Sequence, residues 1–272
     1  MGKFDGILIC TDLDGTLLNS KGVASPENRA AIEYFKAEGG WFTFITGRMP
    51  YYAMHICENV KPNVPFGCIN GGGVYDHVAG KYIWVQEMPK DVCELIKTID
   101  EAFPNVGIQV VGFENSYFCK MNDTMVNFRK ATNLPDIQGH YEDVAVPFAK
   151  ILFGTDIEEE ILAVQDMLRS HPRAGDFDFV RSQRDLTEIL PKGIGKGVAI
   201  EKLVEYLGTD KTIAIGDYDN DVSMFHAAKL GVAVANACPA ALAVADYVTV
   251  SNDEHAIAQI ISDLENGVIN LA

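Results

Sequence analysis

The sequence predicts an α/β protein whose parallel-sheet core is interrupted by an inserted α+β domain. Short apolar runs alternate with helical patterns at both ends of the chain, which is typical of a parallel sheet covered by helices on both faces. The middle of the chain instead repeats the order helix, strand, strand, which favours an antiparallel sheet. With 272 residues, 48% of them hydrophobic, the chain has enough material for a sizeable core in one large domain or two ordinary ones.

The N-terminal segment has the pattern strand, helix, strand. Residues 6–11 and 41–46 are apolar runs of strand length. Between them, Ser25 followed by Pro26 is typical of an N-cap and a first helical position, and the pair Gly39-Gly40 ends the helix. The two strands are therefore expected to lie in the same parallel sheet.

The C-terminal segment resumes this alternation from about residue 192. Ile200, Leu203 and Leu207 recur at helical spacing before Gly208. Further elements are then expected in the order strand 212–216, a helix around Val222 and Phe225, strands 231–235 and 247–250, and an amphipathic helix before Gly267. These elements complete a discontinuous core made of residues 1–81 and 189–272.

Residues 82–188 form the expected inserted domain. A helical stripe over 92–103 precedes strand-like segments at 108–111 and 117–120. A second stripe over 161–168 precedes strand-like segments at 177–181 and 186–190. The polar stretch 121–147 has no pattern that assigns it to a helix or a strand.

The composition excludes several classes of partner. The chain carries 38 Asp and Glu against 22 Lys and Arg, a formal net charge of −16, and no basic run, so neither nucleic acid nor an anionic membrane is expected to bind. No apolar stretch approaches the ~18 residues that a membrane span needs. The N-terminus is unlike a signal peptide, and six dispersed cysteines without a Cys-x-x-Cys motif favour reduced thiols. A cytoplasmic location is therefore expected.

The first candidate site is the run Asp12-Leu13-Asp14-Gly15-Thr16, directly after an apolar strand. Residues two apart on an extended chain point to the same side, so the carboxylates of Asp12 and Asp14 are expected to converge. Ligands of open α/β sheets bind at the carboxyl ends of the strands, which is where this run lies. A solvated turn is the alternative interpretation.

The second candidate site is Gly216-Asp217-Tyr218-Asp219-Asn220-Asp221, which also follows an apolar strand. An EF-hand loop beginning at Asp217 is excluded, because it requires Gly where Val222 stands and Glu where Ala228 stands. Together with the first cluster, these carboxylates favour a hard divalent cation such as Mg²⁺, since only a cation relieves their repulsion. Capping of the next helix is the alternative.

Two further elements could bind an anion. The run Thr46-Gly47-Arg48 ends the second strand and offers a hydroxyl and backbone N–H groups. Lys196 opens a helix within a glycine-rich stretch that lacks the spacing of a Walker loop, and by itself it could equally be a solvated lysine. The turn Asn70-Gly71 has no chemistry that the sequence alone assigns, and the signature of a dinucleotide site is missing.

In this order, the motifs resemble those of the haloacid dehalogenase (HAD) superfamily of phosphohydrolases. The four motifs are Asp12-Leu13-Asp14-Gly15-Thr16-Leu17, Thr46-Gly47-Arg48, Lys196, and Gly216-Asp217 with Asn220-Asp221. The insertion between the second and third motifs, the Asn70-Gly71 turn and residues 234–237 resemble the Cof-type branch. The resemblance spans essentially the whole chain, and it implies a Rossmann-like core, an α/β cap at 82–188 that selects the substrate, and hydrolysis of a small phosphate ester, with sugar phosphates foremost.

The resemblance also implies a role for each motif residue. Asp12 would be the nucleophile that forms an aspartyl-phosphate, and Asp14 would be the general acid and base. A proton donor near neutral pH needs a raised pKa, which a neighbouring carboxylate and partial burial would favour. Mg²⁺ would bind the Asp12 carboxylate, the Asp14 backbone carbonyl and the Asp217 carboxylate, with Asp221 close by. Thr46, Gly47, Lys196 and Asn220 would hold the phosphate, and Arg48 would either meet the substrate or brace a loop.

The motifs leave some questions open. Relatives commonly have Ser where this chain has Gly195, and His255 stands where many have a Gly-Val-Ala stretch, so His255 is expected at the surface near the mouth of the core. A sugar-phosphate mutase is the nearest alternative activity, and a noncatalytic Mg²⁺- or phosphometabolite-binding protein is the alternative from another class. The identity of the phosphorylated metabolite and the oligomeric state do not follow from the sequence.

Overall fold

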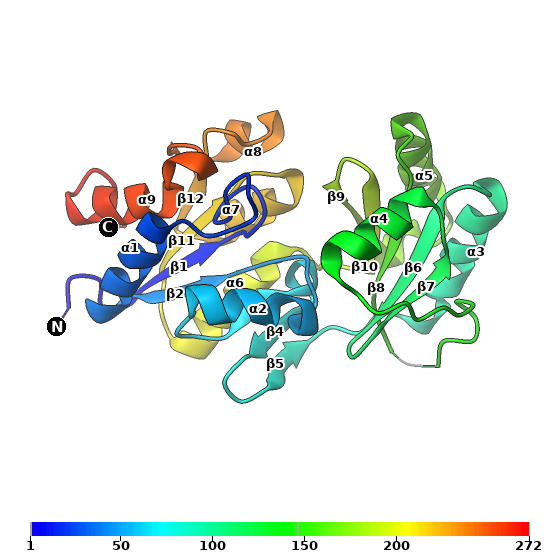
Figure 1. Cartoon of the computed structure of the whole chain (residues 1–272), viewed down its shortest axis with the longest axis horizontal. Coiled ribbons are helices and arrows are strands. Elements are labelled where there is room, and N and C mark those ends of the chain that lie inside the picture. Colours follow the sequence, from blue (N-terminus) through cyan, green and yellow to red (C-terminus); the bar gives the residue numbers. More distant parts are fainter. Residues whose placement is uncertain (1, 146, 272) are drawn as a thin grey trace. The chain divides into compact units, whose positions relative to one another are not determined.

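The computed structural model describes residues 2–145 and 147–271 and divides into two compact units. Unit 1 comprises the residues up to Val85 and from Gly195 onward, and unit 2 comprises Gln86–Ile194. The boundaries lie a few residues beyond those expected at 81 and 189. The chain is an α/β protein with a parallel-sheet core and an inserted unit of α+β type (Figure 1).

Unit 1 is built on a parallel five-stranded sheet with the strand order β13-β12-β11-β1-β2. All its pairings are parallel, and Ile9 of β1 lies between Ile213 of β11 and Phe42 of β2. A small antiparallel sheet, β3-β4-β5, completes the unit. Its elements are β1 (Ile7–Thr11), α1 (Pro26–Ala37), β2 (Trp41–Phe44), α2 (Pro50–Val60), β3 (Phe66–Cys68), β4 (Gly73–Asp76), β5 (Lys81–Val85), α6 (Lys196–Leu207), β11 (Lys211–Gly216), α7 (Val222–Ala227), β12 (Leu230–Ala233), α8 (Pro239–Val244), β13 (Tyr247–Val248) and α9 (Ala256–Glu265).

Helices cover both faces of this sheet, as the nearly continuous apolar strands predict. On one face, Leu8 and Cys10 of β1 share a buried cluster with Ile200 and Leu203 of α6. Helices α1 and α9 pack against each other on the other face (Figure 1). Burial on both sides fixes the sheet, so the carboxyl ends of β1, β2 and β11 lie side by side at one edge.

Unit 2 is built on an antiparallel five-stranded sheet with the strand order β7-β6-β8-β10-β9. Helices α3 and α5 bury one face of it, where Ile99 and Val164 pack against Val110, Ile151 and Ile189. Its elements are α3 (Cys93–Ala102), β6 (Gly107–Gly112), β7 (Ser116–Lys120), α4 (Asp123–Thr132), β8 (Phe148–Gly154), α5 (Glu158–Ser170), β9 (Phe177–Gln183) and β10 (Leu186–Pro191).

The structure adds elements that the sequence pattern does not predict. Helix α2 and the β3-β4-β5 sheet lie in unit 1, and α4 lies in the stretch 121–147, where Asn122 caps it by accepting a hydrogen bond from the Met125 N–H. Strand β8, at the centre of the unit 2 sheet, was also not predicted. Its apolar run is interrupted by Lys150, which hides the strand from a search for apolar continuity.

All six cysteines are free. Among the residues that the structure describes, no helix has the length and apolarity required to cross a bilayer.

Candidate active site

Asp12 lies directly after β1, at the carboxyl edge of the parallel sheet. It is 7% exposed, and its backbone N–H donates to the Ile215 carbonyl at 2.8 Å, which fixes the start of the turn against β11. Gly15 follows with φ of +83°, and a Cβ atom there would lie 2.5 Å from Oδ2 of Asp217. A glycine is therefore required both for the backbone conformation and for the close approach of the Asp217 carboxylate.

Lys196 joins the two acidic clusters. Its Nζ atom lies 2.6 Å from Oδ1 of Asp12 and 2.6 Å from Oδ1 of Asp221, and the residue is 2% exposed. Burial alone lowers the pKa of Lys196, but the charges and hydrogen bonds of the two carboxylates outweigh it and raise the pKa above its usual value. Lys196 is therefore a permanently charged ammonium at the centre of the site.

Asp221 has both carboxylate oxygens engaged by protein donors. While Oδ1 binds Lys196, Oδ2 accepts the backbone N–H of Asp217 at 2.8 Å and that of Tyr218 at 3.0 Å. Gly216 makes this possible, because a Cβ atom there would lie 2.5 Å from the Asp221 Cβ. Fully buried, Asp221 fixes the loop after β11 and orients Lys196.

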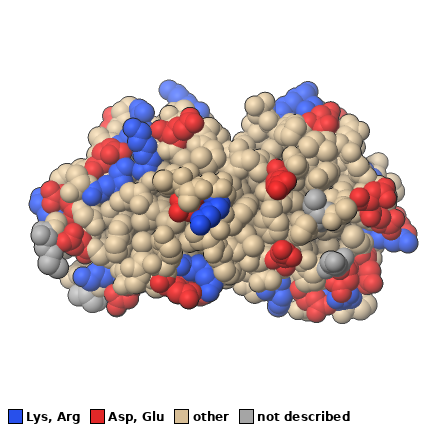
Figure 2. Space-filling model, turned by 90° about the horizontal axis from the view of Figure 1, so that it is seen from below, with Lys and Arg blue, Asp and Glu red and all other residues tan. Residues whose placement is uncertain are grey.

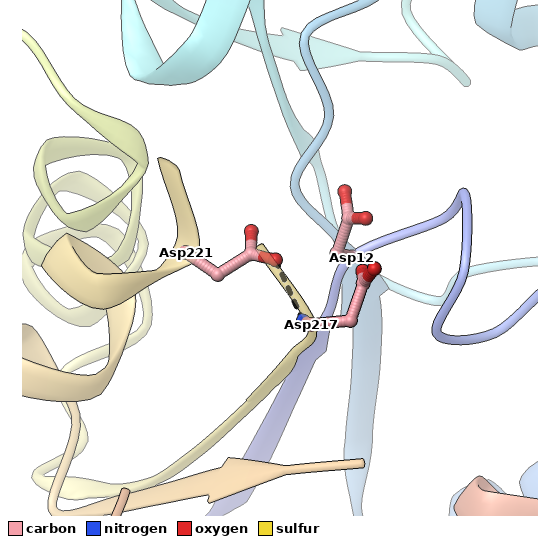
Figure 3. A group of neighbouring side chains, drawn as sticks. All are labelled: Asp12, Asp217 and Asp221. Carbon is pink, nitrogen blue, oxygen red and sulfur yellow. Dashed lines mark hydrogen bonds between the residues drawn. The ribbon is translucent and has the colours of Figure 1, made fainter. Parts of the chain in front are cut away.

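The carboxylates of Asp12, Asp217 and Asp221 form one cluster, shown in Figure 3, with ligand atoms within 4.8 Å of one another. Oδ1 of Asp217 accepts the Thr16 hydroxyl at 2.8 Å. Burial, followed by the charge of Asp221, raises the pKa of Asp217 to about 6, and burial also raises the pKa of Asp12 despite the opposing charge of Lys196. Burial is the larger cause of both shifts, and the repulsion among three carboxylates that share one ammonium adds to it. A divalent cation with a preference for oxygen ligands would relieve this repulsion, so these residues fit such an ion.

Asp14 lies apart from this cluster, although the spacing argument predicted that its carboxylate would converge with that of Asp12. Its side chain is 61% exposed, so the expected partial burial is wrong. Instead it forms a bidentate ion pair with Arg48, at 2.6 Å from Nη2 and 3.1 Å from Nε. The Arg48 guanidinium also lies over the Tyr52 ring, 4.5 Å from its centroid. Arg48 of the second motif thus fixes the side chain of Asp14 in the first motif.

Thr46 and Gly47 follow β2 at the same edge of the sheet. The Thr46 hydroxyl accepts the Arg48 N–H at 3.2 Å, and the Thr46 N–H donates to the Gly67 carbonyl at 3.0 Å. A Cβ atom at Gly47 would lie 2.9 Å from Oδ1 of Asn70, so this glycine allows the Asn70 side chain to approach the turn. Thr46 itself is buried, at 1% exposure.

Asn70 connects the second, third and fourth motifs. Its Oδ1 atom accepts the Asn220 side-chain amide at 3.1 Å, and its own backbone is left-handed, with φ of 50°. Gly71 follows with φ of +92°, and a Cβ atom there would overlap the Gly195 carbonyl oxygen, next to Lys196. The Asn-Gly pair in the sequence signals this turn, but only the fold shows what the turn contacts.

The Ser223 side chain lies next to Gly195. The Ser223 hydroxyl accepts the Gly197 N–H at 3.1 Å, and a Cβ atom at Gly195 would lie 3.1 Å from the same oxygen. A hydroxyl from α7 therefore lies beside residue 195. The sequence pattern did not single out Ser223.

His255 binds the start of α1. Its Nδ1 atom lies 3.0 Å from the hydroxyl of Ser25, the residue that caps this helix, and its backbone is left-handed, with φ of 67°. Asn236, which belongs to the segment 234–237, donates its side-chain amide to the Gly15 carbonyl at 2.9 Å. His255 thus has a structural contact, and Asn236 braces the first motif.

Comparison with known protein families gives a match that includes all of these site residues. A model of the family described as haloacid dehalogenase-like hydrolase matches residues 9–261. The chain belongs to the haloacid dehalogenase superfamily. Within that superfamily it falls in the Cof-type branch, and it is a phosphatase, an enzyme that hydrolyses phosphate monoesters.

Two similar proteins match this chain over nearly their whole length, and a third matches over less than half of its length. A 5-amino-6-(5-phospho-D-ribitylamino)uracil phosphatase of Bacillus subtilis is 28% identical over 286 residues, which cover 95% of this chain and 98% of that protein. A haloacid dehalogenase-like hydrolase structure from B. subtilis is 27% identical with a TM-score of 0.81, over 94% of this chain and 98% of that one. The chain also resembles a chloroplastic endoribonuclease YBEY of Arabidopsis thaliana at 28% identity over 270 residues, but it spans 45% of that longer protein.

Proposed function

We propose that this HAD phosphatase uses Mg²⁺ and hydrolyses small phosphorylated metabolites, sugar phosphates foremost, through an aspartyl-phosphate on Asp12. The observation that carries the proposal is the convergence of Asp12, Lys196 and Asp217 at the carboxyl ends of β1 and β11. A nucleophilic carboxylate needs a neighbouring positive charge to approach an anionic phosphate, and Lys196 lies 2.6 Å from it.

In the first half-reaction, an Asp12 oxygen attacks phosphorus and the bond from phosphorus to the alcohol oxygen breaks. Asp14 donates a proton to that oxygen, so the alcohol leaves neutral. In the second half-reaction, Asp14 takes a proton from water as the water attacks phosphorus, which releases inorganic phosphate and restores Asp12. Thr46, Gly47 and Asn220, at the ends of β2 and β11, would bind the phosphoryl oxygens beside Lys196.

Asp12 and Asp217 would hold Mg²⁺ through their carboxylates, together with the Asp14 backbone carbonyl. Asp221, whose two oxygens accept protein donors, would act nearby by positioning Lys196 and the loop after β11. When bound, Mg²⁺ neutralises the charge that gathers on the phosphoryl group. Lys196 supplies the second positive charge, so a small cationic site forms within a chain whose net charge is −16.

Metal dependence is tested by chelation and by a matched pair of variants. Activity is expected to disappear after exhaustive chelation and to return with Mg²⁺. Asp217→Asn is expected to raise the Mg²⁺ concentration that gives half-maximal activity by about tenfold or more, because one anionic ligand is lost. Asp219→Asn is the control, since Asp219 lies in the same loop but outside the acidic cluster. Full activity of the chelated enzyme, or equal effects of both substitutions, would refute the metal role.

The role of Arg48 is tested by Arg48→Ala. Because Arg48 fixes the carboxylate of Asp14, its loss is expected to reduce kcat for alkyl phosphates by about tenfold to a hundredfold. The effect on p-nitrophenyl phosphate should be smaller, since p-nitrophenolate leaves without a proton. Stability should change by less than about 1 kcal/mol, as for other exposed ion pairs. An equal loss with both esters would instead indicate that Arg48 binds the phosphate.

Unit 1 would be the catalytic core, and unit 2 the cap that selects the substrate. The name of the B. subtilis relative supports a phosphorylated polyol or sugar, since its substrate carries a phosphoribityl group. Lys, Arg, Asp and Glu side chains are interspersed on the face shown in Figure 2, which suits a small ligand better than a polyanion such as nucleic acid. Six free cysteines support a cytoplasmic location.

The experiment that tests the proposal is a screen of phosphorylated metabolites scored by released inorganic phosphate. Release from sugar or polyol phosphates, with water as the acceptor, is expected. Isomerisation of a sugar phosphate without release of phosphate would instead establish a mutase, and binding without turnover would establish a noncatalytic protein.

A further inference from the structure

The turn between the antiparallel strands β3 and β4 in unit 1 has an unusual backbone. Its two central residues, Asn70 and Gly71, have φ of 50° and 92°. The Gly72 N–H closes the turn by donating to the Ile69 carbonyl at 3.0 Å. Asn-Gly is the favoured pair for such a hairpin turn, because both central positions are left-handed. Ile69 is left-handed as well, with φ of 57°, which is rare for a β-branched residue and persists only where the surrounding structure holds it.

Backbone hydrogen bonds tie this turn to the second motif. The Ile69 N–H donates to the Arg48 carbonyl at 3.1 Å. The Asn70 N–H donates to the Thr46 carbonyl, also at 3.1 Å. The residue between those two carbonyls is Gly47, so the turn has a fixed position against the loop that follows β2.

The Asn70 side chain points into unit 1 and not toward solvent. Asn70 is 1% exposed, and a Cβ atom at Gly47 would lie 2.9 Å from its Oδ1 atom, so the amide lies directly against the Gly47 backbone. The hairpin turn requires only a left-handed backbone at this position, which a glycine would supply as well. The turn therefore does not explain the buried amide. With so little exposed surface, the amide can act on a ligand only through a neighbouring side chain.

That neighbour is Asn220, in the loop after β11. The Nδ2 atom of Asn220 donates to Oδ1 of Asn70 at 3.1 Å, across 150 residues of sequence. Asn220 is half-buried and directly precedes Asp221, the partner of Lys196. A carboxamide is planar and its nitrogen carries two N–H groups, so a hydrogen bond from one of them fixes the direction of the other. The Asn70 side chain thus determines where the second N–H of Asn220 points.

We propose that Asn70 is a positioning residue, which orients the Asn220 amide so that its second N–H donates to a phosphoryl oxygen of the substrate. Asn70 itself does not touch the substrate. A donor that is already oriented costs no reorganisation when the phosphate binds. Because every substrate carries the phosphoryl group, the contribution of Asn70 is the same for all alcohol portions. The inference rests on the proposed function, since it concerns the phosphate of that reaction.

The test separates the side chain of residue 70 from its backbone. Asn70→Gly removes the amide and allows the left-handed turn, so kcat/KM is expected to fall about tenfold to a hundredfold, the effect of one hydrogen bond to a charged group. The loss should be the same factor for p-nitrophenyl phosphate and for an alkyl phosphate. Competitive inhibition by inorganic phosphate should weaken as well, because the phosphate loses an oriented donor.

Two further variants check that the backbone is not the cause. Asn70→Ala also removes the amide, so its kcat/KM should equal that of Asn70→Gly, but its Tm should be lower because a Cβ atom disfavours the left-handed conformation. Asn133→Gly is the matched control, since Asn133 is an exposed asparagine at the end of α4 with φ of 51°. It should leave kcat/KM unchanged.

Double variants show whether Asn70 acts through Asn220. Asn220→Ala should lower kcat/KM at least as much as Asn70→Gly, and the combination of both should equal Asn220→Ala alone, whereas a merely structural role of Asn70 would make the two losses multiply. Gly47→Ala tests the same link without a change in the turn, because its Cβ atom displaces the Asn70 side chain. It should lower kcat/KM in wild type and have no further effect beside Asn220→Ala, which decides the inference even if Asn70→Gly does not fold.

The inference is overturned if Asn70→Gly keeps the kcat/KM of wild type, or if its loss and that of Asn220→Ala multiply in the double variant. Failure of wild type to release phosphate from any ester would overturn the proposed function instead. In that case calorimetric titration of inorganic phosphate with Mg²⁺ into wild type, Asn70→Gly and Asn220→Ala decides the inference, since binding does not require turnover. Weaker binding by both variants would support it, and equal affinities, or no binding to wild type, would refute it.

Discussion

Asp12→Asn is expected to reduce turnover by at least about 10⁴-fold while the protein remains folded. The substitution keeps the shape of the side chain and removes the nucleophilic charge. Lys196 retains its second partner, Asp221, at 2.6 Å, so its ammonium stays paired. The change also removes one of three crowded carboxylates, which relieves repulsion. Stability should therefore match or exceed that of wild type.

Two measurements check this prediction together. Steady-state release of phosphate measures turnover, and urea unfolding measures the free energy of unfolding. A control is Asp219→Asn, which makes the same chemical change in the loop after β11, outside the acidic cluster. Turnover of Asp12→Asn close to that of wild type would contradict the nucleophile assignment. Loss of folding would instead show that the fold requires the charged Asp12 side chain as a partner of Lys196.

Lys196→Met is expected to have the largest effect on stability. Lys196 is 2% exposed and is paired with two carboxylates, so its removal leaves Asp12 and Asp221 buried, close together and without a counter-charge. Breaking a buried ion pair by removing one partner costs about 3–5 kcal/mol. Activity should also be lost, since the phosphate loses its adjacent ammonium.

Added Mg²⁺ is expected to restore part of the stability of Lys196→Met, because a cation bound by Asp12 and Asp217 supplies the missing charge. Urea unfolding with and without Mg²⁺ measures this recovery. Lys202→Met is the control, since Lys202 lies on the same helix and its side chain is 36% exposed. A Lys196→Met protein as stable as wild type without metal would show that the acidic cluster is not strained.

The position of the site could be predicted from the sequence, because it depends on where strands end. Asp12 and Asp217 each follow an apolar strand, and parallel strands place their carboxyl ends at one edge. The partners of the side chains could not be predicted. Asp14 pairs with Arg48 and not with the Asp12 group, since partner choice depends on the turn at Gly15 and on where β2 ends.

Helices and strands with a regular apolar pattern were predicted from the sequence. Strand β8 was missed because a charged residue lies within its apolar run. That residue is Lys150, which forms a buried ion pair with Glu188. Thr16 belongs to the first candidate site but was given no role, and Ser223 was not singled out, because a lone hydroxyl has no sequence signal. Their contacts with Asp217 and Gly197 depend on elements some 200 and 26 residues apart, respectively.

The central claim is a covalent phosphoryl group on Asp12, and acid-quenched single turnover with a ³²P-labelled ester tests it most directly. Wild type should carry label on the peptide that contains Asp12. Asp14→Asn should accumulate more of it, because the base that activates water is lost, and Asp12→Asn should carry none. Label on another residue, or a stoichiometric release of phosphate while no protein is labelled at any time, would contradict the mechanism.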